Sequence, residues 1–441
     1  MLEVQPKEGR SKGTAPSRQK LTVGILGAGT VGGGLIRLIQ DNLSHFALPI
    51  EVKRVGVRSI DKARNFSLPE NVLTNDLKSI VEDPSIDIIV EVMGGLEPAR
   101  TYLEAALRLG KHVVTANKFV VSEWGDHLGQ LAAAQGREFH YEASVAGSIP
   151  IVEILKEGVI PDRIVSVFAI LNGTSNFILT RMTERGEDFH AALAMAQEQG
   201  FSEPDPSFDV SGKDAGQKLS ILISILKHRH CHPAQIDIRG IDRLSPWDLQ
   251  FAAQQNWIVK PLSIYEEAAG SGFASVEPVF VSRTSVFAAA RNEYNAICFD
   301  CQHIGKQVFI GKGAGELPTA AALLSDVRKI ALLREGTTHR QHVHLEVDDP
   351  TDLRSSIENP RACQFYVNCC PRNPDKRRKI YEVFSQDSEL IQERSLCTQR
   401  SFGLAVVTKS IRHSELFRIL ELVLSFDPEA EVSWVRILPD V

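Results

Sequence analysis

Two charged side chains in the middle of the chain, Asp214 and Lys218, have types and spacing suited to proton transfer. They stand four residues apart at the start of an apolar helix predicted over 215–226, so both lie on one helix face. An amine beside a carboxylate can move a proton during the oxidation of an alcohol, provided that the pKa of the amine is lowered. The spacing alone favours the plainer interpretation, a surface ion pair contributing less than ~1 kcal/mol.

A second group of residues is suited to binding a dinucleotide. The apolar, strand-like run 21–26 is followed by a glycine-rich loop and then by apolar residues at helical spacing. In this context the first glycine permits a tight turn, the second lets the backbone approach a pyrophosphate, and the third lets helix and strand pack closely. The predicted cofactor loop consists of Gly27, Ala28, Gly29, Thr30, Val31 and Gly32.

The residue after the second predicted strand, 50–57, bears on the choice of cofactor. An Asp or Glu at this place would bind the ribose 2′-hydroxyl of NAD, but the chain has Arg58, followed by Lys62 and Arg64. An arginine can pair with a 2′-phosphate, so NADP is favoured, with NAD as the alternative. The competing interpretation is a solvated basic loop.

The elements that must position these residues alternate between strands and helices. Buried-strand runs at 86–92 and 112–114 flank a helix predicted over 98–109. Such alternation predicts right-handed crossovers and a parallel sheet, with ligands beyond the carboxyl ends of its strands. Lys118 falls at that edge, together with the Gly94–Gly95 turn. It is therefore expected to contact cofactor or substrate, against the plainer interpretation of a surface lysine.

Composition sets the broader class. The 441 residues are 43% hydrophobic and 24% charged with a net charge of -6, ordinary values for a globular chain of two or three domains. Nucleic-acid binding is disfavoured, no apolar run reaches the ~20 residues of a membrane span, and the polar residues 1–20 lack a signal-peptide core. Seven cysteines do not form a disulfide framework. We expect a cytoplasmic protein with a disordered tail over 1–20.

Several long segments, in a fixed order, resemble homoserine dehydrogenases. They are GILGAGTVGGG (24–34), EVMGGLEPA (91–99), TANK (115–118), EASVAGSIPI (142–151), LNGTSNFILT (171–180), EPDPSFDVSGKDAGQKL (203–219) and GKGAGELPTAAALLSDV (311–327). The resemblance implies the NAD(P)-dependent interconversion of L-homoserine and L-aspartate 4-semialdehyde, a step towards threonine, methionine and isoleucine. Two alternatives are another NAD(P) oxidoreductase acting on a related amino or hydroxy acid, and a non-catalytic sensor of cofactor or amino acid.

The resemblance also implies roles for particular residues. Lys218 matches the general acid/base, Asp214 lies beside the substrate hydroxyl, and Lys118 faces both cofactor and substrate. Glu203 matches the carboxylate that binds the substrate ammonium, a charge-assisted contact that a cationic amine requires, and Asp209 is near enough to help. The resemblance further places Asn172, Gly173 and Thr174 near homoserine. It places Gly315 at the nicotinamide ribose.

The resemblance to homoserine dehydrogenases also implies a site for a monovalent cation, sodium in that family, in the segment that begins with Glu142. Its ligands correspond to the Glu142 side chain and the carbonyls of Val145, Gly147 and Ile149, and oxygen ligands suit a hard cation. We interpret this site as structural rather than catalytic. The chain departs from the family at Ser148, which more often is glycine; a serine with a positive φ would strain the loop.

The last third of the chain follows a βαββαβ order over 363–441, which is ferredoxin-like and resembles an ACT domain. Such domains often bind amino acids for feedback control. The loop before the first helix has Asp375 where ACT domains usually have glycine. The Asp375 carboxylate would repel the carboxylate of a ligand. Two interpretations of the C-terminal domain therefore compete. One is a domain that binds an amino-acid effector, and the other is an oligomerisation module without ligand.

The predicted fold class is α/β, with a Rossmann-type doubly wound domain, an α+β substrate domain and a ferredoxin-like C-terminal domain. The resemblance implies a homodimer or homotetramer. The expected domains are an NAD(P)-binding domain at 21–149 plus 316–335, a substrate-binding and dimerisation domain at 150–315, a linker at 336–362 and the ACT-like regulatory domain at 363–441.

Overall fold

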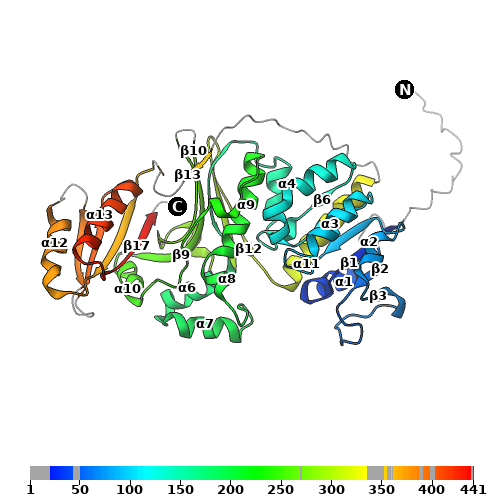
Figure 1. The fold of residues 1–441 in the computed structure, drawn as a ribbon, viewed down its shortest axis with the longest axis horizontal. Helices are drawn as coiled ribbons and strands as arrows, with labels where there is room; N and C mark the ends of the chain where they lie inside the picture. The colour runs from blue at the N-terminus through cyan, green and yellow to red at the C-terminus, as the bar shows by residue number, and fades with distance from the viewer. Residues whose placement is uncertain are drawn as a thin grey trace, which may run out of the picture.

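A computed structural model gives the arrangement of most of the chain. It describes residues 20–42, 50–268, 271–334, 352–354, 359, 361–386, 391–397, 403–438 and 441. The tail expected at 1–20, apart from Lys20, and most of the linker expected at 336–362 lie outside the described residues. Figure 1 shows three successive parts along the long axis of the molecule, which we call the first, second and third layers. Their colours run from blue through green to red.

The first layer is built on a six-stranded sheet in which every described pairing is parallel. The strand order β3-β2-β1-β4-β5-β6 is that of a Rossmann fold and confirms the predicted class. The strands and their helices are β1 (Leu21–Leu26), α1 (Thr30–Asn42), β2 (Ile50–Gly56), β3 (Leu73–Thr74), α2 (Leu77–Glu82), β4 (Ile88–Glu91), α3 (Ala99–Arg108), β5 (His112–Thr115), α4 (Lys118–Ala134) and β6 (Phe139–His140).

A helix from late in the sequence completes this layer. The helix predicted over 320–333 is α11 (Glu316–Arg334), and Figure 1 shows it in yellow among the blue and cyan elements. It packs on α1 at Gly34, where a Cβ atom would lie 2.9 Å from Cγ of Glu316. Leu323 and Val327 then join one buried cluster with apolar residues of β1 and α1. The first layer therefore contains two stretches of chain that are far apart in sequence.

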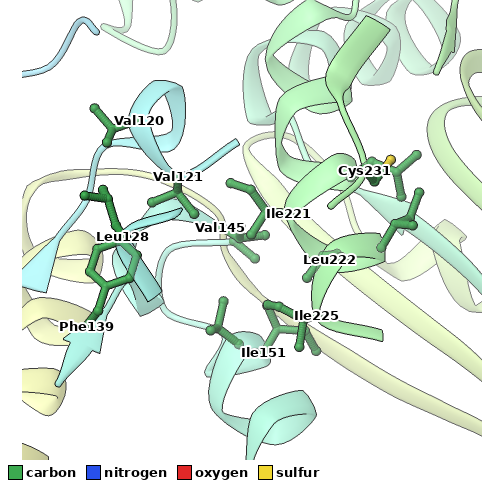
Figure 2. Close-up of a cluster of buried hydrophobic side chains, with 14 of the residues drawn as sticks. Val120, Val121, Leu128, Phe139, Val145, Ile151, Ile221, Leu222, Ile225 and Cys231 are labelled. Atoms are coloured by element: carbon green, nitrogen blue, oxygen red, sulfur yellow. The ribbon is translucent and has the colours of Figure 1, made fainter. Parts of the chain in front are cut away.

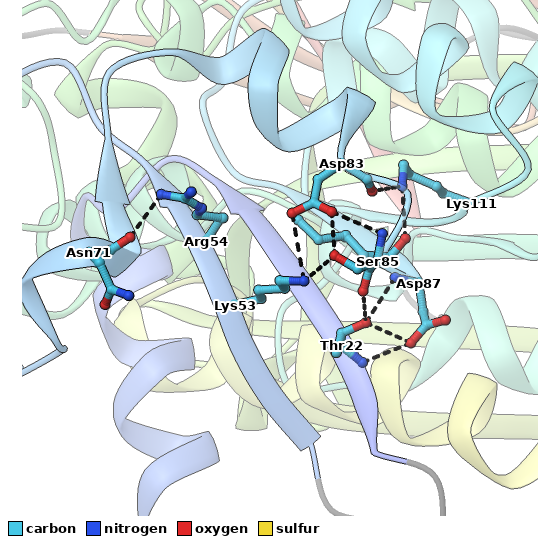
Figure 3. A network of polar contacts seen from close by, with 9 residues as sticks. Thr22, Lys53, Arg54, Asn71, Asp83, Ser85, Asp87 and Lys111 are labelled. Atoms are coloured by element: carbon cyan, nitrogen blue, oxygen red, sulfur yellow. Dashed lines mark hydrogen bonds and ion pairs between the residues drawn. The ribbon is translucent and has the colours of Figure 1, made fainter.

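A polar network ties together the amino ends of the strands in the first sheet (Figure 3). The hydroxyl of Thr22 donates to the Ser85 carbonyl at 2.6 Å, and the Thr22 backbone N–H donates to Asp87 at 2.9 Å. Lys111, which is buried, donates to the Ile86 carbonyl at 2.8 Å, and burial lowers its pKa. These contacts fix the edge of the sheet opposite the glycine loop, so their role is structural.

The second layer is formed by the strands β7 to β13 of an eleven-stranded sheet, with helices over one face. Apolar residues of α6 and α9 pack on alternate residues of its central strands, as one-sided burial requires. Its elements are α5 (Ile151–Lys156), β7 (Ile164–Ile170), α6 (Gly173–Arg185), α7 (Phe189–Glu198), α8 (Ser207–Val210), α9 (Lys213–Lys227), β8 (Asp237–Ile238), α10 (Pro246–Gln254), β9 (Trp257–Ala268), β10 (Ser271–Ser282), β11 (Tyr294–Cys301), β12 (Gly305–Lys312) and β13 (Asp352–Arg354).

The third layer has the predicted βαββαβ order, with antiparallel strands arranged β17-β14-β16-β15, which is ferredoxin-like. Its sheet continues the second one, because β17 pairs in parallel with β10 from Val279 to Val281. The sequence did not predict this continuity. The elements are β14 (Gln364–Cys370), α12 (Arg377–Gln386), β15 (Ile391–Cys397), β16 (Gly403–Thr408), α13 (His413–Phe426) and β17 (Glu431–Leu438).

Buried charges hold this junction together. Arg436 on β17 is fully buried and pairs with Glu266 on β9, which is 1% exposed and also pairs with Arg361. Glu277 on β10 pairs with Arg239, whose guanidinium lies 3.3 Å from the ring centre of Trp434. Because unpaired buried charges are costly, each of these groups depends on partners across the boundary between the second and third layers.

The cysteines whose side chains the structure describes are free thiols: Cys231, Cys298, Cys301, Cys363, Cys369 and Cys370. Burial raises the pKa of the Cys231 thiol to about 12 and that of Cys298 to about 11, so neither thiol is activated as a nucleophile. None of the described helices combines the length and the apolar character needed to span a membrane.

Candidate active site

The candidate catalytic residues come from both of the first two layers. Lys118 is the first residue of α4, whose cap Asn117 accepts from the Val120 backbone N–H, and Asp214 and Lys218 lie on the first turns of α9. Apolar packing between these helices sets their distance: Figure 2 shows Val121 of α4 beside Ile221 of α9 within one buried cluster. The core between the layers therefore positions the charged residues above it.

Asp214 lies between the two lysines. Its Oδ2 is 2.8 Å from Nζ of Lys218, and its Oδ1 is 3.2 Å from Nζ of Lys118. The side chain of Asp214 is 5% exposed and that of Lys218 is 12% exposed. The interpretation of Asp214 and Lys218 as a surface ion pair, which the i,i+4 spacing favoured, is therefore wrong. The packing of α4 and α9 removes both side chains from solvent.

Asn172 links a second carboxylate to the same group. Its side-chain amide donates to both Asp209 and Asp214 at 2.8 Å, while its carbonyl oxygen caps α6 by accepting from the Ser175 N–H. The Thr174 hydroxyl lies 3.1 Å from Asp209. The structure thus brings Asn172, Thr174, Asp209, Asp214, Lys118 and Lys218, all candidates from the sequence, into one polar cluster.

The two carboxylates of the cluster differ in their electrostatics. Burial alone would raise the pKa of Asp214, but the charges of Lys218 and Lys118 outweigh it and lower that pKa to about 2. Burial raises the pKa of Asp209, and the negative charge of Asp214 raises it further. Asp214 is therefore a fixed negative charge, whereas Asp209 forms no ion pair among the described residues and is suited to receive a cation.

Two other candidates have different surroundings. The Glu203 side chain is exposed; its backbone carbonyl accepts from Gln197 and Ser202, and no described contact joins its carboxylate to the polar cluster. Gly173, the first residue of α6, approaches the backbone so closely that a Cβ atom would lie 2.8 Å from the Glu293 carbonyl oxygen. Gly173 therefore serves local packing, as well as lying next to Asn172.

The glycine loop follows β1 and leads directly into α1. Gly27 has a φ of 110°, and a Cβ atom on Gly32 would lie 2.3 Å from the Gly27 carbonyl oxygen, so both positions require glycine. At Gly29, by contrast, nothing lies within 4 Å of where a Cβ would be. This open position beside the α1 amino terminus fits a pyrophosphate, which is the role expected for the middle glycine. Ala28 lies in the same loop, and Thr30 and Val31 are the first residues of α1.

Arg58 lies next to the glycine loop through a backbone contact. The N–H of Gly27 donates to the carbonyl of Gly56 at 3.0 Å, and Arg58 follows two residues later with an exposed side chain. Arg64, by contrast, turns back on its own loop and donates to the Lys62 carbonyl at 2.7 Å. Of the two arginines in this loop, Arg58 is the one suited to reach a ligand.

Glu91, at the carboxyl end of β4, is a site residue that sequence reasoning missed. It is fully buried, and its carboxylate accepts from the Thr115 hydroxyl at 2.6 Å and from the Met93 N–H at 2.7 Å. Burial raises its pKa. It holds the Gly94 turn and the segment before Lys118 together. An acid within the apolar run 86–92 was the signal that could have revealed it.

The segment after Glu142 forms a buried loop. The Glu142 carboxylate accepts from the N–H groups of Val152 and Glu153 at the start of α5, at 2.9 and 2.7 Å. The strain expected at Ser148 is absent, since the positive φ angles fall on Ala146 (57°) and Gly147 (53°).

This loop lies against the loop before α11. A Cβ atom on Gly147 would lie 2.7 Å from the Gly313 carbonyl oxygen, and the Ser148 N–H donates to the Lys312 carbonyl at 3.0 Å. Gly315, which has a φ of 121°, ends that second loop. The candidate residues Val145 and Ile149 are both buried.

Asp326 on α11 is a second buried acid that the sequence analysis missed. It is 1% exposed and accepts from the Glu142 backbone N–H at 2.9 Å. Burial raises the pKa of Glu142, and the nearby charge of Asp326 adds to this, so that it reaches about 7. Within the described ranges, no group of three or more His, Cys, Asp and Glu side chains has the arrangement of a metal site.

A Rossmann sheet with its glycine loop, and a lysine–carboxylate cluster at the carboxyl edge of that sheet, define a nicotinamide-dependent oxidoreductase. Residues 150–327 match the family described as "Homoserine dehydrogenase", and residues 27–142 match "Homoserine dehydrogenase, NAD binding domain". The chain belongs to the homoserine dehydrogenase family. It catalyses the interconversion of L-homoserine and L-aspartate 4-semialdehyde in amino-acid biosynthesis.

Similar proteins extend over nearly the whole chain. The homoserine dehydrogenase of Bacillus subtilis (strain 168) is 36% identical over 418 residues, 94% of this chain and 93% of that protein. The crystal structure of a homoserine dehydrogenase from Thiobacillus denitrificans has a TM-score of 0.84 at 31% identity and covers 96% of this chain and 99% of its own. A hyperthermophilic archaeal homoserine dehydrogenase in complex with NADPH has a TM-score of 0.61 at 25% identity, covering 71% and 98%.

Proposed function

We propose that Lys218 moves the proton between the substrate oxygen and solvent while a hydride moves between the substrate and the nicotinamide. The observation that carries this role is the Lys218–Asp214 pair, held at 2.8 Å and nearly closed to water, with Lys218 also donating to the Leu171 carbonyl at 2.9 Å. Asp214 holds the amine in position for this transfer. Lys118, from the opposite side of Asp214, contacts cofactor and substrate.

The ammonium group of homoserine needs a carboxylate partner. We propose Asp209 for this contact, because it is half-buried beside Asn172 and Thr174, and burial and the charge of Asp214 raise its pKa. Glu203 joins it from the exposed loop between α7 and α8, and Gly173 lies at the same end of α6. A bound nicotinamide supplies or accepts the hydride; the protein supplies position and electrostatics.

We propose NADP as the favoured cofactor because of Arg58. The loop from Gly27 to Gly32 would hold the pyrophosphate, Gly315 would contact the nicotinamide ribose, and Arg58 would pair with the 2′-phosphate. Support comes from the Gly27–Gly56 backbone contact, which fixes the end of β2 beside the glycine loop. A guanidinium suits a phosphate because it can donate two parallel hydrogen bonds.

Arg58→Ala is expected to raise the KM for NADP about tenfold and to change the KM for NAD less than about twofold, since only NADP carries the 2′-phosphate. Initial rates of homoserine oxidation with each cofactor measure both values and test the activity itself. Lys62→Ala, which removes an exposed charge from the same loop, is the matched control. Equal losses with the two cofactors would contradict the role of Arg58.

We also propose that a monovalent cation, sodium in the related proteins, binds at the loop of 142–149. Its ligands would be the Glu142 carboxylate and the carbonyls of Val145, Gly147 and Ile149. Both Glu142 oxygens already accept backbone N–H groups, but a carboxylate has further lone pairs. Glu142 and Asp326 are neighbouring buried acids, and because Lys329 pairs only with Asp326 of the two, the Glu142 carboxylate is left to favour a cation there.

Sodium chloride is expected to raise the thermal midpoint of unfolding by a few degrees relative to tetramethylammonium chloride at equal ionic strength, because only sodium fits the loop. Glu142→Gln should remove this difference. Glu157→Gln, an exposed acid just after α5, should keep it. An unchanged difference in Glu142→Gln would argue against the site.

The homodimer or homotetramer implied by the resemblance, and the boundaries of the three domains, stay predictions. Edge strand β12 exposes Val308 and Ile310, which supports association through the second sheet. The loop 371–376 keeps Asp375 exposed, which favours a C-terminal domain without ligand at that loop.

A further inference from the structure

A cavity of about 510 Å³ lies in the second layer, at the carboxyl end of α6. It is enclosed by the carboxyl-terminal part of α6, the start of β9 and the loop 283–291 that follows β10. β7 pairs with β9 only from Ser263 to Glu266, so no described strand lies beside residues 257–262 on that edge of β9. Figure 1 shows α6 below β9. The volume falls in the range of small-molecule sites.

Positive charge predominates among the side chains that line the cavity. Lys260 is 3% exposed, whereas Arg283 and Arg291 are exposed, so the positive charge extends from the interior to the surface. Glu184 pairs with Arg291, and Arg283 forms no ion pair within the described part of the chain. The carboxyl end of α6 contributes about half a negative charge. Together with Glu184 it offsets only part of the charge of the three cations, so the cavity is suited to an anion.

Lys260 is a buried ammonium group with no carboxylate at ion-pair distance among the residues that the structure describes. Its Nζ donates to the Ala290 carbonyl at 2.6 Å and to Oδ1 of Asn176 at 3.3 Å, which leaves one of its three N–H groups for another acceptor. Burial lowers the pKa of Lys260 to about 8, and the charge of Glu184 opposes this only in part. Because buried charges are normally paired, an anion in the cavity would supply the counter-charge that Lys260 needs.

A hydroxyl group of the cavity wall also has no partner. Oγ1 of Thr183 is buried and makes no hydrogen bond within the described ranges. Thr180, one turn earlier on α6, lines the cavity too, but its hydroxyl donates to the Asn176 carbonyl at 2.7 Å. A buried polar atom without a partner is costly. The Thr183 hydroxyl therefore points, independently of the charges, to a ligand with hydrogen-bonding oxygens.

A phosphate group meets these requirements better than a carboxylate does. It carries a charge of about -1.5 to -2 at pH 7, and its oxygens can accept from an ammonium, a guanidinium and a hydroxyl at once. A carboxylate has one charge and two oxygens.

We propose that this cavity binds a phosphate group, carried either by inorganic phosphate or by a small phosphate monoester. Lys260, Arg283 and Arg291 are its cationic partners, and the Thr183 hydroxyl donates to it as well. Binding here does not depend on the catalytic roles proposed above.

Isothermal calorimetry of the full-length protein against phosphate tests the site without using turnover. Saturating NADPH occupies the cofactor loop, and the sodium concentration and ionic strength are held constant. We expect a Kd of about 1 mM or tighter. Arg283→Ala should weaken binding at least about tenfold and Thr183→Val at least about threefold, for loss of hydrogen bonds to a charged group. Arg185→Ala, which removes an exposed charge of α6 outside the cavity, should leave the Kd unchanged.

Lys260→Met keeps the aliphatic length of the side chain and removes its charge, so it should abolish binding. A thermal unfolding curve shows whether this variant is folded, and phosphate should raise the thermal midpoint of the wild-type protein but not that of Lys260→Met. A second titration with glycerol 3-phosphate distinguishes the sources of the phosphate group. Tighter binding of this monoester than of phosphate would assign the site to monoesters, and the reverse would assign it to the free ion.

Three results would overturn the site. They are absence of binding by both phosphates, unchanged binding in a folded Lys260→Met or Arg283→Ala protein, and an equal response to chloride at the same ionic strength. Binding that is lost in Arg58→Ala but kept in Arg283→Ala would place the phosphate at the cofactor loop and would also overturn it.

Discussion

Lys218→Ala is expected to lower kcat for homoserine oxidation by about 10²- to 10⁴-fold, the range that a positioned general acid or base contributes. The substrate hydroxyl would lose its proton acceptor, while the glycine loop that would hold the cofactor lies between β1 and the first turn of α1 and is untouched. Fluorescence titration with NADPH should therefore give an unchanged Kd. Steady-state kinetics and this titration together separate loss of chemistry from loss of cofactor binding.

Lys213→Ala is the matched control, because Lys213 is exposed and precedes Asp214 on the same helix. Its kcat should equal that of the wild-type protein. A thermal unfolding curve shows whether the Lys218 variant is folded under assay conditions. Wild-type turnover in a folded Lys218→Ala protein would end the proton-transfer assignment.

Asp214→Asn is expected to lower the free energy of unfolding by about 3–5 kcal/mol near neutral pH, since it leaves two ammonium groups without their buried counter-charge. It should also lower kcat, because Lys218 loses the group that fixes it. The thermal midpoint measures the first effect. Asp126→Asn, an exposed acid on α4, should change neither quantity.

The pH dependence gives this prediction a sign. The ordinary pKa of an aspartate here is 3.8, and the lysines hold that of Asp214 at about 2. Its contribution to stability is therefore complete above the ordinary value and is lost as the pH falls through the lowered one. The difference in stability between wild type and Asp214→Asn should shrink over that interval. A difference that stays constant down to the lowest pH would show that the charge of Asp214 does not stabilise the fold.

The order of elements in the first layer could be predicted because local patterns determine it. Alternating apolar runs and helical spacings indicate crossovers, and the context of Gly27 to Gly32 locates the cofactor loop. The joining of β17 to β10 could not be predicted, because it depends on three backbone pairings between strands that are about 150 residues apart. No local pattern at Val279 or Arg436 specifies a partner.

In the candidate site, too, local patterns could be predicted and long-range contacts could not. Sequence patterns and resemblance named Lys118, Asp214 and Lys218, but the i,i+4 spacing favoured a surface pair because spacing carries no information on burial. Packing between α4 and α9 decided that question. Glu91 and Asp326 were missed because an acid within an apolar run looks like an interruption until the partners of its carboxylate are known.

The late position of α11 has a consequence for synthesis of the protein. The apolar residues Leu35, Ile36 and Ile39 of α1 share a buried cluster with α11 residues, which lie more than half the chain further on. During synthesis, the first sheet and α1 therefore lack the cover of α11 until residue 334 has emerged from the ribosomal exit tunnel. A chain truncated after β6 would leave that apolar surface permanently open, and such surfaces promote aggregation.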